Sequence, residues 1–259
     1  MELDPYVERF ALTTSRMIGE NLHTGVSVGE LADAAGYSPF HFSRLFAKVF
    51  RTSPTRYVSA VRFHRAKQLL LAQDHPVIDV CHEVGFNSLA TFSRRFLQAV
   101  AVTPGNLRCV ADRLGETEIP AFALGDQAAV ATGRVIFTPE QRAALRDDLV
   151  HREPLVWIGT YPQPVPLGRP ASGVLRRGEG EFCLPITTTA PWVLATAYPA
   201  SADPAQQLAA SVPMVGMYPG PVRVTPGEVR GGTDIHFRTA LPWDHPVLTA
   251  LPSLAGAPS

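Results

Sequence analysis

The sequence contains few cysteines, no long apolar run and no net charge. Its three cysteines (Cys81, Cys109 and Cys183) are odd in number and share no metal-like spacing. This pattern argues against a disulfide scaffold or a zinc finger and predicts buried thiols in a reducing cytoplasm. No apolar run approaches the roughly 18 residues that span a membrane, and Met1 precedes an acidic stretch rather than a signal peptide. We therefore expect a cytoplasmic protein with no membrane segment.

The zero net charge conceals an uneven distribution. The whole chain holds 23 Lys/Arg and 23 Asp/Glu, but residues 38–108 hold 10 against 3. Residues 109–259 hold 11 Lys/Arg against 14 Asp/Glu. A basic segment joined to an acidic remainder predicts that only the first part of the chain binds a polyanion.

Proline is scarce in the same first part. Only 5 of the 24 prolines precede residue 109, and a chain of 259 residues is long enough for two domains. A change of composition of this kind is typical of a domain boundary. We predict an all-α domain over residues 1–108, a linker over 109–128 and a mainly-β domain over 129–259.

A short motif occurs twice in the first domain, as "GYSPFHFSRLF" at 36–46 and "GFNSLATFSRRF" at 85–96. In each copy a short amphipathic helix ends at a glycine, Gly36 or Gly85, and a serine, Ser38 or Ser88, can cap the next helix. A short helix, a glycine turn and a second helix form a helix-turn-helix unit. The repeat therefore predicts a tandem helix-turn-helix domain with two copies of one working part.

The segment between the two copies predicts a rigid spacer. Residues 55–72 contain no glycine or proline and keep one apolar side. A helix of that length is roughly 27 Å long, and successive major-groove faces of a DNA duplex lie about 34 Å apart. The spacing is consistent with two recognition helices held one duplex turn apart.

Residues 26–108 resemble the DNA-binding domain of AraC/XylS-type bacterial transcription regulators. The motifs that carry this resemblance are "LADAAGYSPFHFSRLF", "YVSAVRFHRAKQLLL", "VIDVCHEVGFNSLATFSRRF" and "TPGNLR". The resemblance implies sequence-specific binding of double-stranded DNA, with both recognition helices in the major groove. We expect no enzymatic activity and no cofactor.

The resemblance also implies which residues read the bases. They are Phe40, Ser43 and Arg44 in the first recognition helix and Leu89, Ala90, Ser93 and Arg94 in the second. Arg44 and Arg94 are candidates for guanine, because a planar guanidinium matches its O6/N7 edge; contact with phosphate or solvent is the alternative. Leu89 and Ala90 offer only apolar surface, so we expect the second unit to read its half-site less stringently.

Phosphate contacts are expected from the helix starts and from nearby cations. The candidates are Ser38, Lys48, Arg51, Arg56, Arg62, Ser88, Arg95 and Arg108; a solvated charged face is the alternative for these cations. Two positions depart from the family pattern, because Arg51 and Ala101 stand where the family usually has glycine after the recognition helix. If their backbone is left-handed, each substitution costs on the order of 1 kcal/mol.

The second domain predicts a β-sandwich, because short strands alternate with Pro/Gly turns. A capped helix is expected over 138–150, and strands over 131–137, 155–161, 171–177, 180–186, 191–199, 221–227 and 233–239. Residues 133–238 weakly resemble prealbumin-like or carboxypeptidase-regulatory-like sandwiches. In family terms such a domain senses a ligand, dimerises or contacts another protein.

Candidate ligand-facing residues of the second domain are Trp157, Tyr161, Trp192 and Tyr198, although aromatic side chains also form sandwich cores. His151, His236 and His245 lie far apart in the sequence, so we expect no metal site. The expected partners are double-stranded DNA and, for a regulator, RNA polymerase, a small-molecule effector and a second copy of the chain.

Two alternative readings of the second domain remain open. It can be a purely structural dimerisation or protein-interaction module. It can also be a DNA-repair enzyme joined to the DNA-binding domain, which would need an activated cysteine with an adjacent base. Cys183, in "EFCLP", has no neighbouring histidine.

Overall fold

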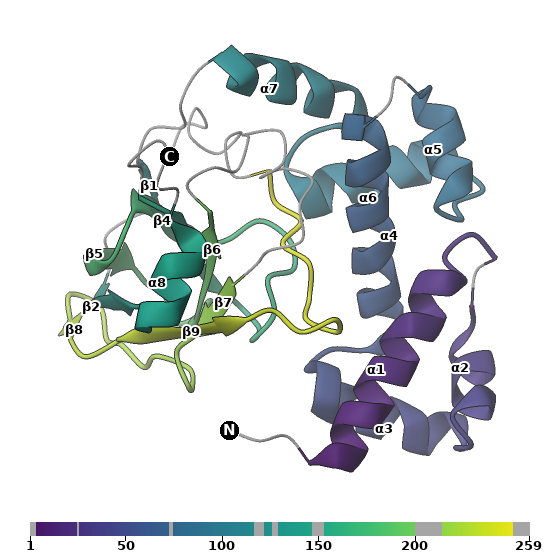
Figure 1. The fold of residues 1–259 in the computed structure, drawn as a ribbon, viewed down its shortest axis with the longest axis horizontal. Helices are drawn as coiled ribbons and strands as arrows, with labels where there is room; N and C mark the ends of the chain where they lie inside the picture. The colour runs from purple at the N-terminus through teal and green to yellow at the C-terminus, as the bar shows by residue number, and fades with distance from the viewer. Residues whose placement is uncertain are drawn as a thin grey trace.

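A computed structural model describes residues 4–24, 26–72, 75–116, 122–125, 129–146, 153–199 and 214–250. The first part of the chain is helical and the second part is built around a sheet (Figure 1). The helices are α1 (Pro5–Glu20), α2 (Val28–Ala34), α3 (Pro39–Phe50), α4 (Pro54–Ala72), α5 (Val77–Glu83), α6 (Leu89–Val100), α7 (Pro104–Glu116) and α8 (Pro139–Leu145). In the described part of the chain, no helix is long and apolar enough to cross a membrane.

Two helical hairpins, α2–α3 and α5–α6, follow the repeated motif. Gly36 and Gly85 end the first helix of each hairpin with φ of 73° and 79°, a conformation that glycine adopts without steric cost. A Cβ at Gly85 would also lie 2.5 Å from the carbonyl oxygen of Leu22. The hydroxyls of Ser38 and Ser88 then accept from the third amide of the next helix, each at 3.3 Å. The predicted caps and turns of both hairpins are confirmed.

α4 packs against both hairpins. Tyr57, near its start, belongs to a cluster in which α1 and α3 contribute Phe10, Phe42, Phe46 and Phe50. Phe46 and Phe50 stack with their ring centroids 4.0 Å apart. The spacer helix therefore fixes the first hairpin by aromatic packing at one end.

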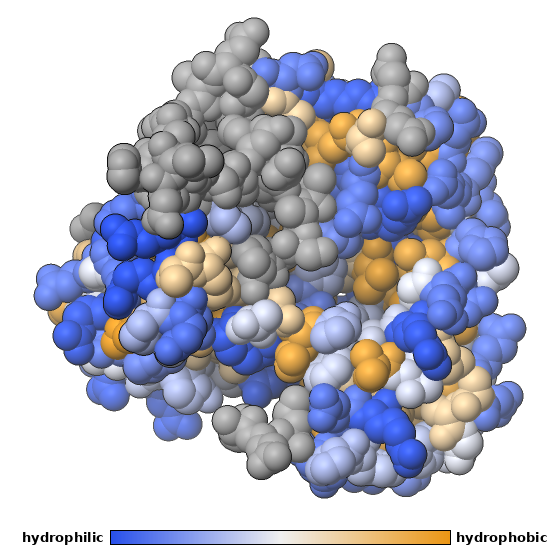
Figure 2. Space-filling view, in the orientation of Figure 1, coloured by the Kyte–Doolittle hydropathy of each residue, from blue (hydrophilic) through white to orange (hydrophobic). Residues whose placement is uncertain are grey.

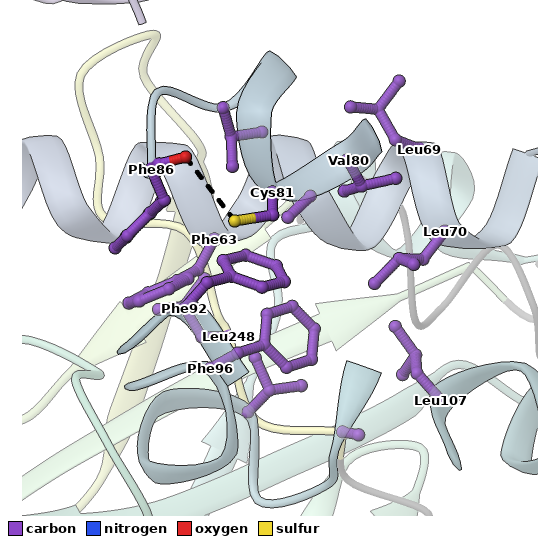
Figure 3. Close-up of a cluster of buried hydrophobic side chains, with 14 of the residues drawn as sticks. Phe63, Leu69, Leu70, Val80, Cys81, Phe86, Phe92, Phe96, Leu107 and Leu248 are labelled. Atoms are coloured by element: carbon purple, nitrogen blue, oxygen red, sulfur yellow. Dashed lines mark hydrogen bonds between the residues drawn. The ribbon is translucent and has the colours of Figure 1, made fainter. Parts of the chain in front are cut away.

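The middle and the C-terminal part of α4 pack on the second hairpin. Phe63 lies among Phe86, Phe92 and Phe96 in a second buried cluster (Figure 3). The ring of Phe63 stacks on that of Phe86 at 5.5 Å. Because one straight helix supplies a side of both cores, the two hairpins are held at a set separation.

The strand-rich part is one continuous sheet that curls back on itself. Its strands are β1 (Phe122–Leu124), β2 (Val130–Ile136), β3 (Leu155–Tyr161), β4 (Ser172–Arg177), β5 (Gly180–Pro185), β6 (Trp192–Tyr198), β7 (Met214–Met217), β8 (Val229–Arg230) and β9 (Ile235–Thr239). They pair in the order β1-β4-β3-β6-β7-β9-β2-β5, with β8 on β2. Near the two ends of this path, Ser172 of β4 bonds the carbonyl of Pro185 in β5. The arrangement is a nearly closed barrel.

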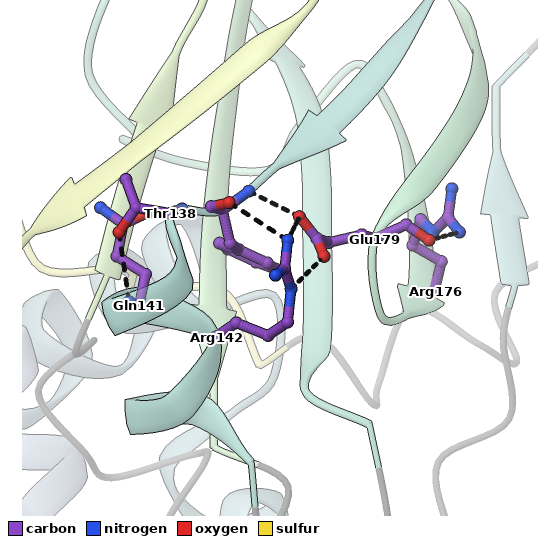
Figure 4. A network of polar contacts seen from close by, with 6 residues as sticks. Thr138, Gln141, Arg142, Arg176 and Glu179 are labelled. Carbon is purple, nitrogen blue, oxygen red and sulfur yellow. Dashed lines mark hydrogen bonds and ion pairs between the residues drawn. The ribbon is translucent and has the colours of Figure 1, made fainter.

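α8 lies over this sheet and is tied to it by a polar network (Figure 4). Thr138 and Gln141 cap each other at the start of the helix. Arg142 then forms an ion pair with Glu179 at 2.6 Å, and Glu179 also accepts from the amide of Phe137 at 2.8 Å. The buried side chain of Leu145 packs among residues of the sheet. These contacts fix α8 to the turn between β4 and β5.

The predicted β-sandwich and its family resemblance are not confirmed. Alternating apolar residues identify strands and their buried faces, but they do not specify which strands pair. The predicted strand at 221–227 is irregular, and β1, β7 and β8 were not predicted.

α7 continues to Glu116 and β1 pairs with β4 where a linker was expected. The expectation of buried thiols holds for Cys81 and is wrong for Cys109 and Cys183, which are exposed.

The end of the described chain returns to the helices. After β9 this return segment, residues 241–250, runs alongside them (Figure 1). The Tyr57 hydroxyl donates to the carbonyl of Trp243 at 3.2 Å, and the amide of Ala250 donates to the carbonyl of Val100 at 2.9 Å. Leu248 is 1% exposed within the core of the second hairpin. The return segment thus contacts α4 and the second hairpin.

Candidate nucleic-acid interface

The predicted base-reading residues lie on the outward side of α3 and α6. In each helix a buried stripe, Phe42 and Phe46 or Phe92 and Phe96, faces the core. The predicted base-reading residues lie outside this stripe, either two or three positions before Phe42 and Phe92 or one and two positions after them. The outward positions are Phe40, Ser43, Arg44, Leu89, Ala90, Ser93 and Arg94; the serines are half-buried and the others are exposed.

The first helix presents an aromatic ring beside a cation. Phe40 is 73% exposed, which is costly for a side chain with no polar atom. The Arg44 guanidinium carbon lies 5.8 Å from the centre of the Phe40 ring. A ring in this position orients the guanidinium while leaving its N–H donors available to a partner.

The second helix presents a more apolar surface. Leu89 is 39% and Leu97 is 44% exposed, and Ala90 is exposed as well. Arg94 occupies the position that corresponds to Arg44. The two helices thus share one geometry but differ in chemistry.

The ends of both helices have left-handed backbone. Arg51 has φ of 56° and Ala101 has φ of 69°, where glycine is favoured. Both residues therefore have the left-handed backbone that costs a residue other than glycine on the order of 1 kcal/mol. The Arg51 guanidinium approaches the sulfur of Met217 in β7 at 3.5 Å.

The predicted phosphate-contacting residues divide into two groups. Ser38, Lys48, Arg51, Arg56, Ser88 and Arg95 are exposed. Arg62 instead donates to the carbonyl of Leu22 at 3.1 Å, and burial lowers the pKa of its guanidinium. Arg108 donates to the carbonyls of Leu70, at 3.0 Å, and His75. Arg62 and Arg108 therefore hold together segments that are distant in sequence.

The aromatic candidates of the strand-rich part lie mostly in its interior. Trp157, Tyr161 and Tyr198 are buried and Trp192 is half-buried. The Trp157 indole donates to the Tyr161 hydroxyl at 3.4 Å, and burial raises the pKa of Tyr161 to about 12. A cavity of about 630 Å³ lies elsewhere, between α4, α6 and residues 162–168.

The histidines are not brought together. His236 is exposed on β9, and His245 bonds the carbonyl of Phe50 at 2.9 Å; His151 lies outside the described residues. Within the described ranges no group of three His, Cys, Asp or Glu residues has the arrangement of a metal site.

A buried lysine was not anticipated from the sequence. Lys67 of α4 is 2% exposed, and its amine donates to the carbonyls of Val247 and Leu248 at 3.2 and 2.9 Å. Burial lowers the pKa of Lys67 to about 7. A lysine just before the apolar run Leu69–Leu71 of a predicted helix was the available signal, but its acceptors lie in the distant return segment.

A model of the family described as "Helix-turn-helix domain" matches residues 31–109, which run from α2 into α7. Residues 31–109 form an AraC-type helix-turn-helix domain. The resemblance expected from the motifs is confirmed for this part of the chain.

Much of the visible surface of the protein is hydrophilic, with apolar patches among the helices (Figure 2).

Proteins of known sequence are similar to part of this chain. An uncharacterized HTH-type transcriptional regulator of Bacillus subtilis, YbfP, is 31% identical over 103 residues, which cover 40% of this chain and 35% of that protein. The HTH-type transcriptional regulator Rv1931c of Mycobacterium tuberculosis is 33% identical over 81 residues, or 31% of each chain. The match thus spans about a third of the length of these relatives.

Solved structures are also similar to part of this chain. An AraC-type transcriptional regulator from Chromobacterium violaceum is 24% identical, with a TM-score of 0.39, and the match covers 41% of this chain and 95% of that one. The DNA-binding domain of AdpA, solved with a target DNA, is 24% identical with a TM-score of 0.38, over 40% of this chain and 93% of that one.

Proposed function

We propose that this protein regulates transcription by binding double-stranded DNA at specific sequences, with α3 and α6 in adjacent major-groove segments. The observation that carries the proposal is the matched pair of serine-capped helices, packed on one spacer helix and exposed at equivalent positions. α4 has 19 residues, which correspond to a length of about 28 Å. With the bodies of the hairpins at its ends, this length suits the repeat of about 34 Å between groove faces.

The base readers follow from the chemistry of the two outward surfaces. Arg44 is proposed to bind a guanine with two N–H donors, because its guanidinium is positioned beside the Phe40 ring. Ser43 and Ser93 can donate or accept and so specify little. Leu89 and Ala90 are suited to thymine methyl groups, and Arg94 is the candidate for a second guanine. This difference makes the first half-site the more stringent one.

Phosphate contacts are proposed for the helix starts and for the exposed cations beside them. Amides at the start of a helix attract anions, and Ser38 and Ser88 mark these starts on the two recognition helices. Lys48 and Arg51, at the end of α3, add positive charge. Arg62 and Arg108 are left out of this set because their guanidinium groups bond backbone carbonyls.

Selection of bound sequences from a pool of random DNA duplexes tests this function. The expected result is an enriched site with two blocks of preferred bases, centred about one helical turn apart. Binding that falls steeply with salt but enriches no sequence would contradict sequence-specific recognition.

The strand-rich part is proposed to sense a ligand or to mediate assembly. RNA polymerase and a second copy of the chain are the candidate macromolecular partners. The mass in solution, measured with and without DNA, separates the roles: a monomer in both states contradicts assembly, and a dimer in both states supports it.

A further inference from the structure

A groove of about 630 Å³ separates the second recognition helix from the strand-rich part. One side consists of α4 and α6, and the other consists of the loop between β3 and β4, residues 162–168. Leu248 of the return segment also lines it. The volume falls in the range of small-molecule sites, about 300–1,000 Å³.

The floor of the groove is apolar. Phe63, Val165 and Leu248 are buried, with exposures of 4%, 3% and 1%, and Leu167 packs beside them. These residues come from the spacer helix, the loop and the return segment. An apolar body placed here would therefore touch both parts of the protein at once.

The rim of the groove carries two cations, Arg56 of α4 and Arg95 of α6. Both side chains are exposed, and neither forms an ion pair with any acidic side chain in the described ranges. Arg56 donates to the neutral side chain of Gln163 at 3.0 Å, which leaves most of its donors and its whole charge available. By contrast, Arg65 on the same helix pairs with Glu83 at 3.3 Å.

We propose that this groove binds a small organic carboxylate with an apolar body, the carboxylate between Arg56 and Arg95 and the body on the apolar floor. Two unpaired guanidinium groups favour a planar anion, and the buried floor favours a hydrocarbon rather than an inorganic ion. The proposal deepens the sensing role given above to the strand-rich part, and for its effect on DNA it rests on that proposed function.

Such a ligand would be coupled to DNA through α6. This helix carries Arg95 toward the groove and its neighbour Arg94 toward the outward surface. A ligand whose carboxylate lies between α4 and α6 and whose apolar body contacts the loop therefore changes how firmly the recognition helix is held by the strand-rich part. By linkage, the DNA site would change the affinity for the carboxylate by the same factor.

Isothermal titration of the full chain with 2-naphthoate tests the site. Its uncharged counterpart 2-naphthamide and inorganic phosphate separate the contributions of the anion and the apolar body. We expect saturable binding of one naphthoate per chain and binding of each other probe at least about tenfold weaker. Arg56→Met and Arg95→Met should each weaken naphthoate binding about tenfold, whereas Arg65→Met, the matched control, should leave it unchanged.

Ala99→Trp provides a second test that keeps both charges. Ala99 is half-buried and lines the groove, so an indole there should abolish binding by filling the space. Thermal unfolding of each variant verifies that it is folded. Absence of saturable naphthoate binding, equal binding of the amide, or full binding by both arginine variants would overturn the proposal.

The same variants distinguish a carboxylate site from a DNA contact. If Arg56→Met and Arg95→Met each lower the salt dependence of DNA binding by about one phosphate contact, and leave naphthoate binding intact, the arginines serve DNA and the carboxylate site is wrong. Wild-type protein that selects a DNA site without binding naphthoate contradicts this inference alone. Protein that binds naphthoate without selecting DNA contradicts the proposed function alone.

Discussion

Ala101 ends α6 in a left-handed conformation, with φ of 69°. A methyl group disfavours this backbone relative to glycine. We predict that Ala101→Gly raises the free energy of unfolding by up to about 1 kcal/mol, measured by thermal or urea denaturation.

Ala47→Gly is the matched control, because Ala47 is exposed within α3. There the same substitution should lower stability by about 1 kcal/mol, since glycine weakens a helix interior. A loss of stability in both variants would contradict the account of the left-handed helix end.

Lys67 gives the protein a stability that depends on pH. Burial lowers the pKa of its amine from 10.5 to about 7, so between these values the unfolded chain binds a proton that the folded chain lacks. The free energy of unfolding therefore rises with pH across this window, and the contribution is lowest and constant below about pH 7. The neutral amine retains two N–H donors for its two carbonyl acceptors.

Urea denaturation of the wild type and of Lys67→Met at several pH values measures this effect. We predict that the wild type gains stability relative to Lys67→Met as the pH rises from about 7 to about 10. Arg65→Met, an exposed change on the same helix, should keep the wild-type slope. A constant difference between wild type and Lys67→Met would show that Lys67 keeps its proton when buried.

Arg44 is the residue on which the proposed base reading depends most. Arg44→Met should cost about 1–3 kcal/mol on the selected DNA site and relax one base preference, measured by fluorescence anisotropy on the site and its single-base variants. Arg134→Met in β2 removes the same charge away from the recognition helices and should have no such effect. A uniform loss on all sequences would mean that Arg44 contacts only the DNA backbone.

Local signals made several of these residues predictable. Ser38 and Gly85 act within a few positions of their partners. The inward phenylalanines of α3 and α6 are spaced four residues apart along one helix, so spacing alone identified all of these residues. Arg62, Lys67 and Arg108 could not be assigned in this way, because their acceptors are carbonyls 33 to 181 residues away. A cation near an amphipathic face has the same sequence signature whether it binds phosphate or a distant backbone.

At the scale of elements, helices were easier to predict than the sheet. α3 and α6 are defined by caps and by a period of 3.6 residues, which are local properties. The order β1-β4-β3-β6-β7-β9-β2-β5 joins strands far apart in the chain. The short β8, with two exposed residues, has no alternating pattern that would reveal it.

The return segment is an element of the helical core despite its position after the sheet. Leu248 is 1% exposed among residues of α4, α5 and α6 (Figure 3). We predict that Leu248→Ala lowers the free energy of unfolding by about 2–5 kcal/mol, measured by urea denaturation followed by helical circular dichroism.

Val229→Ala is the control for this prediction, because Val229 is 67% exposed on β8. It should change stability by less than about 0.5 kcal/mol. A similarly small effect of Leu248→Ala would mean that the helices are stable without the return segment.

At the scale of the whole molecule, the helical part and the strand-rich part, which were predicted from composition as separate domains, contact each other through several segments. The return segment contacts the first hairpin where His245 bonds the carbonyl of Phe50, and the second where Ala250 bonds the carbonyl of Val100. Arg51 also reaches Met217 of the sheet. A shift in proline content and charge marks the boundary between the helical and the strand-rich parts. It carries no information about the later return segment, which packs on the helices.

The central claim is that α3 and α6 are held rigidly and read DNA together. Inserting half a helical turn, about five base pairs, between the two blocks of the selected site tests it most directly by fluorescence anisotropy. The insertion turns the second block to the opposite side of the duplex, so the predicted affinity falls to that for the first block alone. An affinity equal to that for the uninterrupted site would contradict the account.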